Sequence, residues 1–101
     1  MALMEISVVP LGTGTPSVSG LVAAAVREAE SSGLETEVTP MGTVVGGEVE
    51  ELLALAGKMH RAVLSGEVKR VVTSIKIDDR ADKALTGKGK VSSVREKLAG
   101  Q

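Results

Sequence analysis

The side chains best suited to catalysis are few, and they do not form a recognisable catalytic set. His60 is the only histidine and the chain has no cysteine, so neither a second metal-binding imidazole nor a thiol nucleophile accompanies it. His60 also falls on the apolar side of an expected helix, where a histidine bonded to a neighbour at the edge of the core is the usual role. We therefore predict no catalytic residue, no metal site and no enzymatic activity.

A cluster of aspartates follows the last expected strand. Asp78, Asp79 and Asp82 lie close together in the sequence, but the basic residues Arg80 and Lys83 interleave with them. The ligand spacing of a calcium-binding loop is absent. These carboxylates are expected to form surface ion pairs or to brace the polar loop that contains them.

Two glycine-containing segments partly match phosphate-binding motifs. Residues 12–17 (GTGTPS) carry two glycines of a dinucleotide fingerprint but a serine where the third belongs, and residues 86–90 (TGKGK) lack the spacing of a phosphate loop. Residues 12–17 nevertheless precede an expected helix N-terminus, where free amides and the dipole favour an anion or a polar ligand edge. Simple capping by Thr15, with Pro16 in the first helical position, is the alternative.

Composition limits the classes of function that the chain can have. Its 101 residues, 43% of them hydrophobic, fit one domain over residues 1–101. A net charge of −1 provides no field that would gather nucleic acid or an anionic membrane. Without a signal-peptide pattern or a long apolar run, we expect a cytoplasmic protein. The chain has no Phe, Trp or Tyr, so any flat ligand must be held without aromatic stacking.

Hydrophobic periodicity predicts elements that would position these residues. We expect two strand-helix-strand halves joined by a bend at residues 38–45, in which Pro40 removes an amide donor and Gly42 tolerates positive φ. A short helix containing Ser93 follows a polar loop over residues 78–90. The expected elements are strands over residues 3–10, 34–39 and 69–77, a short strand ending at Gly46 and Gly47, and helices over residues 16–32 and from about 48 to 65. This order predicts an α+β fold, a ferredoxin-like βαββαβ sandwich with a short C-terminal helix.

In this sandwich both long helices would cover one face of the sheet and leave the other open. Alternation in the first strand directs Met4, Ile6 and Val8 toward the core. The open face is expected to carry Ser7, Val9, Glu37, Thr39, Thr43, Val45, Val72, Ser74 and Lys76. Such a face suits packing on a second copy or a shallow polar pocket, although the valines could equally reflect strand propensity alone.

Four ordered segments resemble the thiamine-binding protein domain family, a group of small ferredoxin-like proteins long regarded as uncharacterised. They are Glu5–Ser17 (EISVVPLGTGTPS), Thr39–Thr43 (TPMGT), Lys58–His60 (KMH) and Lys69–Arg80 (KRVVTSIKIDDR). The resemblance covers nearly the whole chain. It implies a ferredoxin-like fold, assembly into dimers or tetramers through the sheets, and binding of thiamine or its hydroxymethylpyrimidine part, without established catalysis.

We therefore expect non-enzymatic binding of thiamine or a related hydroxymethylpyrimidine metabolite by a homodimer or homotetramer, with no cofactor. Hydroxyl groups would orient the ligand, a methionine would give apolar contact, and a carboxylate would pair with an aminopyrimidine or a thiazolium. The expected ligand-binding residues are Ser7, Thr15, Ser17, Thr39, Met41, Thr43, Ser74 and Asp78. The alternative is a structural or regulatory oligomer whose sheet face serves assembly only.

Overall fold

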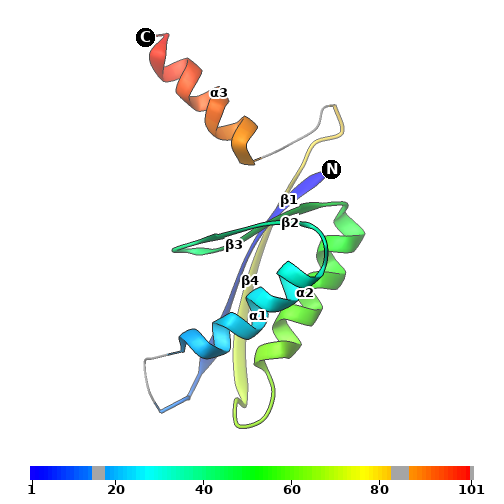
Figure 1. Ribbon diagram of the computed structural model, residues 1–101, viewed down its shortest axis with the longest axis vertical. Coiled ribbons are helices and arrows are strands. Elements are labelled where there is room, and N and C mark those ends of the chain that lie inside the picture. The colour runs from blue at the N-terminus through cyan, green and yellow to red at the C-terminus, as the bar shows by residue number, and fades with distance from the viewer. Residues whose placement is uncertain (15–17, 83–86, 101) are drawn as a thin grey trace.

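The computed structural model describes residues 1–14, 18–82 and 87–100. It shows the expected βαββαβ order followed by a C-terminal helix, a ferredoxin-like arrangement (Figure 1). The elements are β1 (Ala2–Leu11), α1 (Ser19–Ser31), β2 (Glu35–Thr39), β3 (Gly42–Gly47), α2 (Val49–Val63), β4 (Arg70–Asp79) and α3 (Gly87–Ala99). None of the helices in these described parts has the length and apolar character that crossing a bilayer requires.

The strands form one antiparallel sheet in the order β2-β3-β1-β4. β1 pairs with β4 from Ala2 to Leu11, but its pairing with β3 ends at Ile6, opposite Thr43. The rest of β1 therefore has a strand neighbour on one side only. Pro10 lies in this stretch. Proline, which has no N–H, is tolerated there because one edge of β1 has no neighbouring strand to accept a main-chain hydrogen bond.

The core lies between the sheet and the helices α1 and α2, which run side by side across one face (Figure 1). β1 sends Met4, Ile6 and Val8 into it, and all three are buried as predicted. α2 contributes the larger helical share: Leu52, Leu55, Ala56, Met59 and Val63. α1 buries only two alanines. Since each fully buried Leu, Met or Val is worth roughly 1.5–3 kcal/mol, α2 stabilises this fold more than α1 does.

The helix ends explain where the expected boundaries hold and where they fail. α2 begins with a reciprocal capping box: the side chain of Glu48 accepts the main-chain N–H of Glu51, and the side chain of Glu51 accepts the main-chain N–H of Glu48. α1 begins at Ser19 rather than at Pro16, and Val18 occupies its N-cap without a side-chain hydrogen bond. The expected cap at Thr15 lies outside the described residues.

The C-terminal segment differs from its prediction. The expected loop over residues 78–90 was wrong at both ends, because β4 continues to Asp79 and α3 begins at Gly87. The helix can extend ahead of Ser93 because Lys90 is a good helix former whose ammonium also pairs with Asp78 of β4. α3 stands apart from the two-layer body (Figure 1). Its apolar residues Val91, Val94 and Leu98 are exposed.

The alternation predicted for β3 was wrong by one residue. Thr39 and Gly42 stand directly opposite each other, so the turn contains only Pro40 and Met41. Thr43 therefore lies on the helix side, where it is 5% exposed. Val45 follows it there and is fully buried, not on the open face as expected. A slip of one residue moves every side chain of a strand to the opposite face.

Candidate ligand-binding site

A pocket of about 200 Å³ lies where β1 runs past the end of β3. Its walls come from three segments that are distant in the sequence: the middle of β1, the first half of α1 and the turn between β2 and β3. Met59 of α2 also reaches it. The lining residues are Ile6, Ser7, Val8, Val9, Val22, Ala25, Val26, Val38, Thr39, Pro40, Met41, Gly42, Thr43 and Met59. None of these described lining residues is titratable.

The turn that closes one side of the pocket is braced by Thr39. Its hydroxyl donates to the carbonyl of Gly42 at 2.8 Å and accepts the amide N–H of Met41 at 3.2 Å. This is the side-chain-to-backbone bonding that makes threonine effective at turns. Thr39 thus fixes the shape of the pocket, while Met41, 82% exposed, extends from the tip of the turn.

Gly42 allows the turn to press against β1. A Cβ at this position would lie 3.0 Å from the carbonyl oxygen of Ile6. Gly42 is not among the glycines of positive φ, so the sequence-based expectation of a left-handed residue here was wrong. Glycine is needed at this position because the backbones of β1 and β3 approach each other too closely for a side chain, and not because of positive φ.

Two hydroxyl groups remain for a ligand. Ser7 and Thr43 line the pocket from opposite faces of the sheet, Ser7 half-buried and Thr43 buried. Neither side chain has a hydrogen bond to another described residue. A mostly apolar pocket with a few convergent polar groups is the usual form of a small-molecule site.

The structure brings four of the eight predicted site residues to this pocket: Ser7, Thr39, Met41 and Thr43. Ser74 stands directly opposite Ser7 on β4, exposed, and does not line the pocket. Asp78 lies opposite Leu3, toward the other end of the sheet, and pairs with Lys90. Thr15 and Ser17 fall outside the described residues.

The helical wall of the pocket was not among the residues predicted from the sequence. Val22 and Val26 of α1 line the pocket together with Ala25. Their spacing of one helical turn was a usable signal. The missing fact was that β3 begins only at Gly42, so its pairing with β1 stops at Ile6 and leaves space between β1 and α1.

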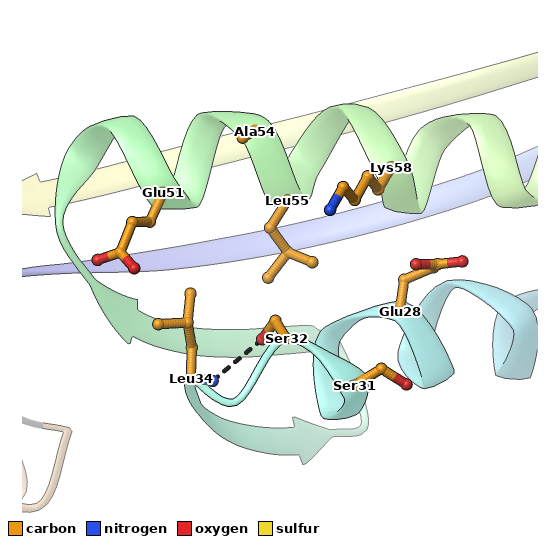
Figure 2. A pocket seen from close by; sticks show the side chains of 8 residues that line it. All are labelled: Glu28, Ser31, Ser32, Leu34, Glu51, Ala54, Leu55 and Lys58. Carbon is orange, nitrogen blue, oxygen red and sulfur yellow. Dashed lines mark hydrogen bonds between the residues drawn. The ribbon is translucent and has the colours of Figure 1, made fainter.

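A second crevice, of about 280 Å³, lies between the C-terminal end of α1 and α2 (Figure 2). Two of its polar residues, Glu51 and Ser32, already serve helix ends. Glu51 accepts the amide of Glu48 in the capping box, and the Ser32 hydroxyl accepts the amide of Leu34 at 3.1 Å, the dashed line in Figure 2. Lys58 and Glu28 border the crevice from the two helices.

His60 has the structural role that the sequence favoured. Its Nδ1 lies 2.7 Å from the Thr73 hydroxyl, a hydrogen bond that joins α2 to β4. The side chain is half-buried at the edge of the core. The expectation of a histidine bonded to a neighbour is therefore confirmed.

Comparison with known proteins gives one consistent family. A sequence profile described as "Thiamine-binding protein" matches residues 4–95. The chain is 38% identical to the UPF0045 protein YqgV of Bacillus subtilis, over 97% of this chain and 98% of that protein. The solved structure of MJ1052 from Methanocaldococcus jannaschii has a TM-score of 0.86 at 38% identity, covering 94% of this chain and 96% of that one. A Thermotoga maritima protein described as a candidate for thiamine biosynthesis or salvage has a TM-score of 0.78 at 30% identity, covering 92% of this chain and 97% of that one.

Proposed function

The chain belongs to the thiamine-binding protein family, and we propose that its pocket beside β1 binds the hydroxymethylpyrimidine part of thiamine, free or as part of the vitamin, without chemical turnover. One observation carries the proposal: Ser7, Thr39, Met41 and Thr43, from two segments separate in sequence, border one largely apolar pocket. The absence of titratable groups among its described lining residues agrees with binding rather than catalysis.

The size and lining of the pocket favour a single ring. Its volume of about 200 Å³ is below the roughly 300–1,000 Å³ of sites for drug-sized ligands. A pyrimidine would fit between the aliphatic walls, and the thiazolium of thiamine would extend outward. Because the chain has no aromatic residue, contact would come from valines and methionines, whose side chains pack against flat surfaces without stacking.

We propose further that the open face of the sheet packs against a second copy of the chain. Val9 and Val72 stand opposite each other on β1 and β4, each 45% exposed, and Leu11 continues the patch. Burying one valine is worth on the order of 1.5 kcal/mol or more, and identical patches suit a two-fold interface. This patch is also the observation that favours the second candidate function, a structural or regulatory oligomer that binds no metabolite.

A matched pair of variants tests the binding proposal. Ser7→Ala and Ser74→Ala each remove one hydroxyl, at opposed positions on neighbouring strands, but only Ser7 lines the pocket. Leaving a ligand atom unpaired costs roughly 1–3 kcal/mol, so calorimetric affinity for hydroxymethylpyrimidine should fall about 5- to 150-fold in Ser7→Ala. Ser74→Ala should bind as the unmodified chain does. Equal affinity in all three proteins would remove Ser7 from the site, and no heat of binding in any would leave the assembly function.

A further inference from the structure

The backbone of β1 offers an unpaired edge inside the pocket. The Ile6 carbonyl oxygen would lie 3.0 Å from a Cβ at Gly42, so it points toward β3. Main-chain groups alternate between the two sides of a strand, and the N–H and C=O of Val8 therefore point to that same side. β3 ends before it reaches Val8, so the register gives these two groups no strand partner.

Unpaired main-chain groups are unusual in a place as enclosed as this one. Val8 is 6% exposed and lines the pocket. Buried N–H and C=O groups are almost always hydrogen-bonded, since an unpaired group costs about as much as a lost hydrogen bond. Because the described strands supply no partner for Val8, we expect a bound ligand to supply it.

The edge is too short to accept another β-strand. Pro10, two residues further along the same edge, has no N–H to donate. An added strand relies on a series of main-chain hydrogen bonds, whereas this edge offers one donor and one nearby acceptor at Val8. That pair matches a planar ring that carries an acceptor nitrogen next to an amino group.

We infer that the main-chain N–H and C=O of Val8 select the ligand by binding the aminopyrimidine edge. The ring nitrogen accepts from the Val8 N–H, and the exocyclic amino group donates to the Val8 carbonyl. This inference rests on the proposed function, but it makes the backbone of β1, rather than a side chain, the determinant of specificity. The site then takes planar heterocycles with this donor and acceptor edge.

Amide hydrogen exchange of the full chain, followed by nuclear magnetic resonance, tests the inference residue by residue. In the free protein the Val8 amide should exchange at least about tenfold faster than the ladder amide of Ile6, because unpaired amides are not protected. Saturation with hydroxymethylpyrimidine should slow exchange at Val8 by at least about tenfold. Ile6 is the internal control and should change much less. Calorimetry is run on the same sample.

A ligand analogue completes the test. Pyrimidine that keeps the hydroxymethyl and methyl groups but lacks the amino group should bind at least about tenfold more weakly, since the Val8 carbonyl stays unpaired. Binding of hydroxymethylpyrimidine without protection of Val8, or equal affinity for the analogue, would overturn the backbone inference and leave the proposed function intact. Absence of any binding heat would overturn both.

Discussion

Replacing Gly42 by alanine should destabilise the protein through a single backbone contact. The new Cβ would lie 3.0 Å from the carbonyl oxygen of Ile6 and 3.6 Å from Cγ of Glu5. The carbonyl belongs to β1 beside its last pairing with β3, so it cannot turn away as a flexible side chain could. Overpacking of this kind costs roughly 1–3 kcal/mol, and the lower entropy of an unfolded chain with alanine offsets about 0.4–1 kcal/mol.

The expected net loss for Gly42→Ala therefore lies between about 0 and 2.6 kcal/mol, with a central value of about 1.3 kcal/mol. For a domain of this size the central value lowers the melting temperature by about 5–10 °C. Far-ultraviolet circular dichroism is the suitable probe, because the chain has no aromatic residue to report by fluorescence. The turn should also move away from β1, so affinity for hydroxymethylpyrimidine should fall in the same variant.

Gly46→Ala is the matched control on the same strand. A Cβ there would meet Leu3 Cδ2 at 3.6 Å and the Ala2 carbonyl oxygen at 4.0 Å, which are ordinary contacts. Neither Gly42 nor Gly46 has positive φ, so backbone strain does not separate them. Gly46→Ala should change stability by less than about 0.5 kcal/mol or raise it slightly. Equal melting temperatures for the two variants would refute the close-approach explanation.

Three further predictions concern the pocket, the open face and α3. Thr43→Val keeps the shape of a buried side chain but removes a hydroxyl of the pocket, so calorimetric affinity should fall by roughly 1–3 kcal/mol; unchanged affinity with a lower melting temperature would make the residue structural. Val72→Lys places a charge in the exposed valine patch, and light scattering at micromolar protein should then show a smaller assembly than for the unmodified chain; a monomer in both cases would contradict the proposed interface. Asp78→Asn removes an exposed ion pair with Lys90, which should cost less than about 1 kcal/mol; a loss in melting temperature as large as that of Gly42→Ala would show that α3 is bound more firmly than this pair suggests.

Local pattern was sufficient for much of the fold. The alternation of Met4, Ile6 and Val8 placed β1 correctly on the core, and the acidic start of α2 correctly marked its N-terminus. The side of the sheet that each β3 residue faces was predicted wrongly, because it depends on the number of residues in the turn between β2 and β3. With only Pro40 and Met41 between the strands, Gly42 opposes Thr39, and every later residue of β3 faces the other way.

The pocket itself could be anticipated only in part. Its hydroxyl residues lie in segments that the sequence singled out, the first strand and the bend. Its existence depends on tertiary facts that no local pattern contains: β3 ends beside Ile6, and α1 passes close enough for Val22 and Val26 to close the space. The free main-chain edge at Val8 has the same cause, because β1 extends further than the neighbouring β3.

A crystal structure of the chain grown with hydroxymethylpyrimidine tests the central claim most directly. We expect one ring per subunit in the pocket between β1, α1 and the β2–β3 turn, with Ser7 or Thr43 within hydrogen-bond distance of its polar atoms. A ring bound in the crevice of Figure 2, a ring on the open face of the sheet, or an empty pocket at saturating concentration would contradict the account.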